Sequence, residues 1–188
     1  MNHTRVSIQT GDFDLGAEVA ALRAADARAG AVCAFVGAVR EMASPTAAAA
    51  TTAAGADAAA ATASAAAPPG ITALELEHYP GMSEKAIARM VAAARQRFDI
   101  GGVRIIHRVG ALAPRDQIVL VAVAAAHRGA AFQACEFLMD YLKTQVPFWK
   151  KEHTANGQAH WVRARASDDA ALARWGDGAA AGNAATRR

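Results

Sequence analysis

A long alanine-rich segment divides the chain and limits how its fold can be assembled. Residues 43–69, "ASPTAAAATTAAGADAAAATASAAAPP", contain no large apolar side chain and no apolar periodicity. Such a segment cannot bury enough apolar surface to offset the entropy lost on ordering. We therefore expect a flexible insertion at 43–69 inside one domain that spans residues 1–175. For the same reason, residues 176–188, "GDGAAAGNAATRR", are expected to be a disordered tail.

The rest of the chain alternates between strand and helix patterns. Strand patterns occur at 4–10, 31–39, 72–79, 103–109 and 117–125, and helix patterns at about 15–25, 83–98 and 129–145. Ser83 is the expected N-cap of the second helix, and Asn156-Gly157 is a hairpin signal. Because strands outnumber helices and several are joined by short turns, the sequence predicts an α+β fold with a largely antiparallel sheet and packed helices.

Composition narrows the class of protein. The formal net charge is +3, which is too mild to demand a nucleic-acid partner. No stretch approaches the roughly 20 apolar residues of a membrane span, and the N-terminus lacks the pattern of a signal peptide, so we expect a cytoplasmic protein that does not bind membranes. Cys33 and Cys135 lie among apolar neighbours without metal-ligand spacing, and we expect both in the core.

Lysine is concentrated in one stretch. The sequence has 20 lysines and arginines, of which four are lysine, and three of these lie in "MDYLKTQVPFWKKEH". Unlike guanidinium, an ammonium loses its proton readily when buried, so it can exchange protons or act as a nucleophile. An ordinary solvated basic turn, or a helix-surface pair between Asp140 and Lys143, would also explain the pattern.

The spacing of two lysines favours a site. Lys143 falls in the last turn of the predicted third helix, and Lys150 follows Pro147, which ends that helix. The turn at the proline lets the two cations converge, with Phe148 and Trp149 as apolar walls. Like charges at close range lower the pKa of one amine, which then becomes a proton acceptor or nucleophile near neutral pH.

Two further positions are candidates for binding an anion. Arg40 closes the strand "FVGAVR", and the pair His127 and Arg128 stands immediately before a predicted helix. A helix N-terminus with adjacent cationic side chains can bind phosphate, although capping and surface solvation are equally good readings for any one of these residues. The similar pair His107 and Arg108 has no helix behind it and is interpreted as structural.

Several motifs together resemble the large, catalytic subunit of molybdopterin synthase. They are, in order, "FVGAVR", "LELEHYPGMSEKA", "IIHRVGAL", "AHRGAAFQACEFLMDYLKTQVPFWKKE" and "WVRAR". The resemblance covers nearly the whole chain except the insertion and the tail, and "MDYLKTxxPFWKKE" is its most specific part.

The resemblance implies a sulfurtransferase of molybdenum cofactor biosynthesis, working without a cofactor or metal. Its substrate would be cyclic pyranopterin monophosphate, which receives two sulfurs as the dithiolene of molybdopterin. The sulfur would arrive as a thiocarboxylate on the C-terminal Gly-Gly of a small ubiquitin-like subunit, whose tail enters the large subunit's pocket. The assembly implied is a homodimer of large subunits within a heterotetramer.

The resemblance also assigns roles to individual residues. Lys143 and Lys150 would be catalytic. The residues implied in substrate binding are Ala38, Val39, Arg40, His127, Arg128, Lys151, Glu152 and Arg165, with Arg165 serving the neighbouring subunit's site. Ala38 departs from the longer or polar residue expected there in many relatives, and the insertion follows Arg40 closely enough to act as a lid or as a passive loop.

Two readings from other classes compete with the enzyme. The basic and aromatic patch could bind single-stranded nucleic acid through stacking and backbone charge. Alternatively, the chain could be a non-catalytic scaffold that docks a ubiquitin-like protein. A scaffold has no evident use for Lys143, Lys150 and Arg40 together with the His127 and Arg128 pair, so the sequence favours the enzyme.

Overall fold

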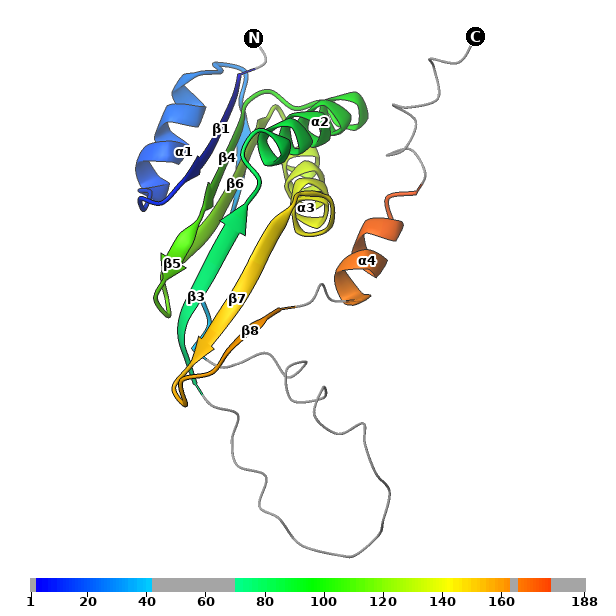
Figure 1. The fold of residues 1–188 in the computed structure, drawn as a ribbon. Helices are drawn as coiled ribbons and strands as arrows, with labels where there is room; N and C mark the ends of the chain where they lie inside the picture. The colour runs from blue at the N-terminus through cyan, green and yellow to red at the C-terminus, as the bar shows by residue number, and fades with distance from the viewer. Residues whose placement is uncertain (1–2, 42–69, 163–165, 177–188) are drawn as a thin grey trace, which may run out of the picture.

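The chain folds into two four-stranded sheets, with helices covering both faces of the first (Figure 1). The computed structural model describes residues 3–41, 70–162 and 166–176, so the predicted insertion and all but the first residue of the predicted tail lie outside the described residues. The strands are β1 (Thr4–Gln9), β2 (Ala31–Ala38), β3 (Ile71–His78), β4 (Val103–Arg108), β5 (Gly110–Leu112), β6 (Gln117–Ala125), β7 (Phe148–Thr154) and β8 (Ala159–Trp161). The helices are α1 (Leu15–Ala24), α2 (Met82–Arg97), α3 (Arg128–Gln145) and α4 (Ala166–Ala173).

Strand pairing confirms the α+β class and its largely antiparallel character. The first sheet has the order β1-β4-β6-β2, and within it only β1 and β4 run parallel. The second sheet, β5-β3-β7-β8, is antiparallel throughout. The division into two sheets, the short strand β5 and helix α4 were not predicted. No helix in the described part of the chain is long and apolar enough to cross a membrane.

Strand β6 lies inside the first sheet and is buried on both faces. Val119, Val121 and Val123 pack into the core formed with α2 and α3, whereas Leu120 and Ala122 pack beneath α1. Successive strand residues point to opposite faces, so a strand covered on both sides needs an unbroken apolar run. The sequence "QIVLVAVAA" is such a run, and it lets helices pack against both faces of the sheet.

The apolar stripes of α2 and α3 are buried as predicted, but the start of α2 differs from the prediction. The N-cap is Gly81, whose φ of 79° suits glycine, and its N–H donates to the Glu84 carboxylate at 2.6 Å. Ser83 is fully buried and its hydroxyl donates to the Pro147 carbonyl at 3.2 Å. Ser83 therefore ties α2 to the loop after α3 instead of capping its own helix.

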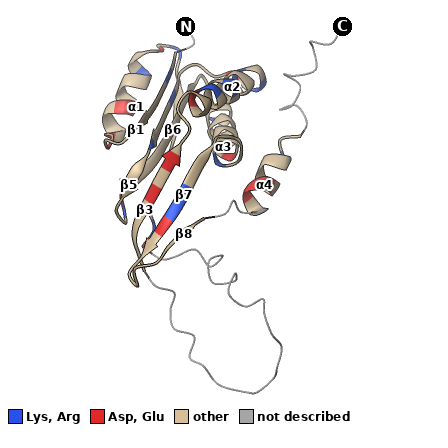
Figure 2. Cartoon of the chain, viewed as in Figure 1, with Lys and Arg blue, Asp and Glu red and all other residues tan. Residues whose placement is uncertain are grey.

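The second sheet places the lysine-rich segment on strand β7. Its register pairs Leu76 with Lys150 and Glu75 with Lys151, so acidic β3 and basic β7 residues lie side by side (Figure 2). The predicted hairpin joins β7 to β8, with Gly157 at a φ of 79°. This hairpin ends the second sheet and leads the chain back towards α3.

A buried ion pair fastens α1 to the first sheet. Arg104 is 4% exposed, and its guanidinium donates to both carboxylate oxygens of Glu18, at 2.6 and 2.9 Å. It also donates to the Ser7 hydroxyl at 2.9 Å. The hydrogen bonds from Arg104 hold the pKa of Glu18 below its usual value, although burial opposes this. Arg104 is thus a buried charge whose compensation depends mainly on Glu18.

We predict that Glu18→Ala lowers the free energy of unfolding by about 3 kcal/mol, because it leaves the Arg104 charge buried and uncompensated. The matched control is Glu41→Ala, which removes the exposed pair between Glu41 and Arg115 and should cost less than about 1 kcal/mol. Urea denaturation of both variants at neutral pH measures the difference. Equal losses would show that Glu18 contributes no more than a surface carboxylate.

Candidate active site

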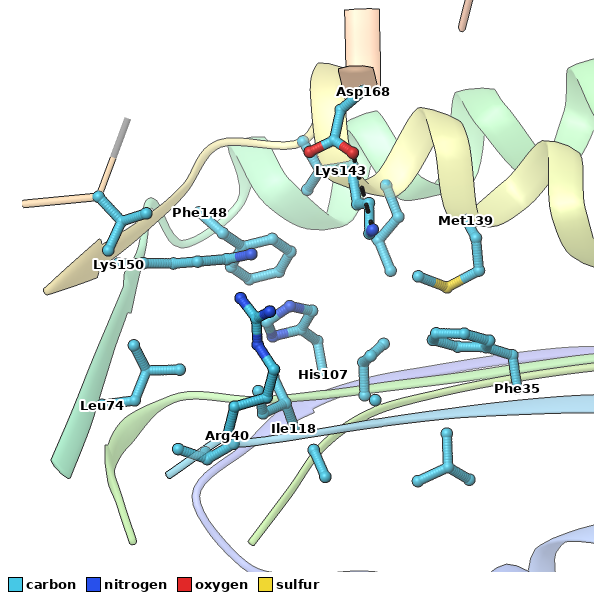
Figure 3. Close-up of a pocket in the computed structure, with 18 of the residues that line it drawn as sticks. Phe35, Arg40, Leu74, His107, Ile118, Met139, Lys143, Phe148, Lys150 and Asp168 are labelled. Atoms are coloured by element: carbon cyan, nitrogen blue, oxygen red, sulfur yellow. Dashed lines mark ion pairs between the residues drawn. The ribbon is translucent and has the colours of Figure 1, made fainter. Parts of the chain in front are cut away.

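A cavity of about 570 Å³ lies between the two sheets at the C-terminal end of α3 (Figure 3). Its walls come from the end of β2, from β7, from the last turns of α3 and from α4. Three cationic and two acidic side chains line it, and apolar residues form the rest of the wall. The charged residues are Arg40, Lys143, Lys150, Glu152 and Asp168.

The two lysines singled out from the sequence meet in this cavity. Lys143 lies in the last turn of α3, which Val146 caps in an extended conformation before Pro147. The chain then enters β7, where Lys150 is half-buried and points to the same side as Phe148. In Figure 3 the nitrogen ends of Lys143, Lys150 and Arg40 all point into the cavity. The predicted convergence across the proline turn is therefore present.

Lys143 is held from α4 and not from its own helix. Its Nζ lies 3.7 Å from the Asp168 carboxylate. Asp140, the partner considered from the sequence, instead accepts hydrogen bonds from Arg174 and from the Trp175 indole, both at 2.7 Å. Asp140 therefore binds the residues that follow α4 and so holds α4 against α3. Asp168, on α4, then lies close to Lys143.

The end of β2 supplies the opposite wall. Ala38, Val39 and Arg40 all line the cavity, with Val39 buried and Arg40 exposed. Glu152 of β7 faces them and is 6% exposed, and its Oε2 has no hydrogen-bond partner in the structure. An unpartnered carboxylate oxygen buried beside a cavity can accept a hydrogen bond from a ligand that enters.

A stacked histidine forms the floor of the cavity. The ring of His107 lies parallel to that of Phe148, with centroids 3.7 Å apart and an interplanar angle of 9°. Burial, with a smaller effect of nearby Lys150, lowers the pKa of His107 to about 4, and the hydrogen bond to the Arg108 carbonyl partly opposes this shift. His107 is therefore neutral at physiological pH. Its Nδ1–H donates to that carbonyl at 2.8 Å, which leaves Nε2 as an acceptor.

Some residues assigned from the resemblance do not reach this cavity in one chain. Strand alternation turns Lys151 to the opposite face of the sheet, where its Nζ is 3.9 Å from the Glu75 carboxylate and 5.5 Å from the centroid of the Trp161 ring. His127 and Arg128 are exposed at the N-terminus of α3, the far end of the helix from Lys143. Arg165 lies outside the described residues. Their roles in substrate binding remain predictions.

The sequence patterns do not identify every residue of the cavity. His107, which they predict to be structural, lines it, and so do Phe35 and Asp168, for which they predict no role. Phe35 could have been found, because it stands in the same strand motif as Arg40. Asp168 carried none, because its approach to Lys143 depends on the packing of α4.

We predict that His107 makes stability fall in acid. Its folded pKa of about 4 lies below the ordinary value of 6.5, so the unfolded chain binds the proton more tightly. The stabilisation is complete above pH 6.5 and is lost as the pH falls towards 4, by about 2 to 3 kcal/mol. Denaturant unfolding of wild type and His107→Gln between pH 7 and 4.5 should show their difference shrinking by this amount, whereas parallel curves would contradict the assignment.

Comparison with known proteins agrees with this geometry. The family model "MoaE protein" matches residues 8–145. A molybdopterin synthase catalytic subunit from Ralstonia nicotianae is 53% identical over 91% of this chain and 84% of its own length. One from Cereibacter sphaeroides is 44% identical over 91% and 99%. The solved structure of the molybdopterin biosynthesis MoaE protein from Burkholderia ambifaria has a TM-score of 0.68 and 50% identity, covering 94% of this chain and 99% of that one. The chain therefore belongs to the MoaE family, the catalytic subunits of molybdopterin synthase.

Proposed function

We propose that this chain transfers sulfur from a thiocarboxylate at the C-terminal Gly-Gly of a small ubiquitin-like subunit to cyclic pyranopterin monophosphate. The product would be the dithiolene of molybdopterin. Membership of a family of catalytic subunits supports the enzyme and not the nucleic-acid or scaffold alternative. The observation that carries the proposal is the meeting of Lys143, Lys150 and Arg40 in one partly apolar cavity.

The cavity matches the charges of both proposed reactants. A thiocarboxylate and a cyclic phosphate are each anionic, and a partly buried ammonium or guanidinium binds such groups more strongly than a solvated one. In our proposal Arg40 binds the phosphate, and the two lysines hold the thiocarboxylate and move protons as the phosphate ring opens. Glu152 would accept a hydrogen bond from a pterin N–H with its unpartnered oxygen.

The positions of His127 and Arg128 favour a site shared between two copies. A helix rises about 1.5 Å per residue, which puts about 22 Å along α3 between Arg128 and Lys143. Arg128 cannot contact a small substrate beside Lys143 of its own chain across that length. In a two-fold dimer, however, each copy can present the N-terminus of its α3 to the other copy's cavity. We infer that His127 and Arg128 of the second copy bind the substrate in this way, together with Arg40 of the first.

The proposed assembly follows from this shared site. Two large subunits would form the homodimer, and each would receive the tail of one small subunit, giving a heterotetramer. A flexible Gly-Gly terminus is thin enough to enter a cavity bounded by Phe35 and Phe148.

We predict that Lys143→Ala and Lys150→Ala each reduce product formation by about 10²- to 10⁴-fold, the usual range for losing a group that transfers protons. Lys143→Arg should fail as well, because guanidinium keeps the charge but does not exchange its proton. Lys85→Ala, which removes a lysine of α2 outside the cavity, is the control and should retain activity. The measurement is dithiolene formed from a thiocarboxylated small subunit and cyclic pyranopterin monophosphate. A substantially active Lys143→Arg would mean that the lysine serves only as a cation.

The shared site is tested by mixing two inactive variants. Lys143→Ala and Arg128→Ala homodimers should both be poor enzymes. In a mixed dimer, one site carries both lesions and the other carries neither. With random exchange, about half of the dimers are mixed and about a quarter of all sites are intact. Co-refolding should therefore restore activity towards that fraction, with exchange verified by native mass spectrometry. No recovery after verified exchange would place Arg128 outside the partner's site.

A further inference from the structure

Both cysteines of the chain line a second cavity, of about 500 Å³, beside the active site. This cavity lies where α3 packs on β2, and it shares Phe35, Met139 and Lys143 with the first cavity. The sequence predicts both cysteines in the core. The structure confirms this for Cys135 and packs the partly buried Cys33 against the same cluster, beside the helix that carries Lys143.

The two thiols approach each other from facing elements. Cys135 points from the inner face of α3, and its Sγ lies 3.5 Å from the carbonyl oxygen of Val121 on β6. Cys33 lies on β2 and packs against the same core cluster. It is also two residues from Phe35, which pairs with Val121, so Cys33 and Phe35 point to the same side of the strand. Both cysteine side chains therefore lie between α3 and β2, where they line the same cavity and pack against the same core cluster.

Their surroundings give the two thiols different reactivity. Burial, together with the neighbouring Cys33, raises the pKa of Cys135 to about 12. Cys135 therefore remains a protonated thiol at neutral pH and is only 3% exposed. Cys33 is partly exposed, so a small oxidant reaches Cys33 first.

We propose that Cys33 and Cys135 form a reversible disulfide that joins β2 to α3 and slows sulfur transfer at the neighbouring site. The thiolate of Cys33 attacks a low-molecular-weight disulfide and releases one thiolate, leaving a mixed disulfide on Cys33. Cys135 then loses its proton and attacks the Cys33 sulfur, releasing the second thiolate. Overall, the two cysteines give up two protons and two electrons, and the small disulfide is reduced to two thiols.

The catalytic consequence rests on the function proposed above and follows from the geometry of α3. A disulfide fixes its two sulfurs about 2.05 Å apart, closer than two thiols in contact. Met139 and Lys143 lie one and two turns after Cys135 on the same helix, and both line the active-site cavity. If the disulfide moves α3 towards β2, Lys143 moves with the helix. Displacing a catalytic group by about 1 Å is enough to slow a reaction severely.

The test uses the full chain incubated with oxidised glutathione, quenched by alkylation and measured as intact mass. Wild type should give the mass of a single chain less two hydrogens, and it should resist alkylation. Peptide mapping should recover Cys33 linked to Cys135. Cys135→Ala should stop at the glutathione adduct on Cys33, and Cys33→Ala should show no adduct. A glutathione adduct that persists in wild type, a disulfide between two copies, or no oxidation would each overturn the proposal.

The second arm measures product formation before oxidation, after it, and after reduction with dithiothreitol. We expect turnover to fall about tenfold or more on oxidation and to return on reduction. Cys33→Ala should be insensitive to the oxidant. An oxidised wild type with unchanged turnover would overturn the coupling to the site. If reduced wild type made no product, the proposed function would fail, while the mass measurement would still decide whether the disulfide forms.

Discussion

The packing of α3 against β2 and β6 is the constraint on which the site depends. The inner face of α3 is closed by Ala131, Cys135, Leu138 and Leu142, all at most 4% exposed. Small side chains near the start of this face let the helix approach the sheet closely. The same packing sets where the last turn of α3 ends. The position of Lys143 is therefore decided by the core and not by the loop that follows it.

Asp168 orients Lys143 towards the cavity from a distance longer than a hydrogen bond. The Asp168 carboxylate lies 3.7 Å from Lys143, beyond hydrogen-bond length, and about half of the Lys143 side chain stays exposed. The tighter bonds of Asp140 go to Arg174 and Trp175, outside the cavity. His107 adds no positive charge, because burial keeps it neutral. The cavity thus presents two lysines and one arginine to an incoming anion, while the stacked rings of His107 and Phe148 form an uncharged floor.

Local patterns in the sequence predicted most elements but could not predict how they combine. The apolar runs and stripes gave five strands and three helices, and Pro147 correctly indicated that the chain turns between Lys143 and Lys150. The separation into two sheets depends on pairing between distant strands, such as β3 with β7, which periodicity does not specify. The N-cap assignment failed at Ser83 because a buried hydroxyl and a capping hydroxyl look alike in sequence.

Which candidate residues line the cavity could be predicted where neighbouring residues of one segment place them, and not where the placement depends on distant elements. Arg40 follows the strand motif that lines one wall, and Lys150 follows the turn, so both could be placed by their neighbours. Lys151 shows the limit, because moving one residue along a strand reverses the face to which a side chain points. That His107 also lines the cavity could not be predicted, because its stacking partner Phe148 comes from a strand of the other sheet.

Helix α3 has opposite electrostatic character at its two ends, and both ends suit the proposed chemistry. Its N-terminus carries partial positive charge and exposes His127 and Arg128, which favours an anion. Its C-terminus carries partial negative charge, which favours the ammonium of Lys143. One straight helix cannot bring its two ends to one substrate. In the two-fold pair of chains that we propose, each helix would give a cation to its own cavity and an anion-binding end to the cavity of its neighbour. Dimerisation would then complete the site as well as stabilise the fold.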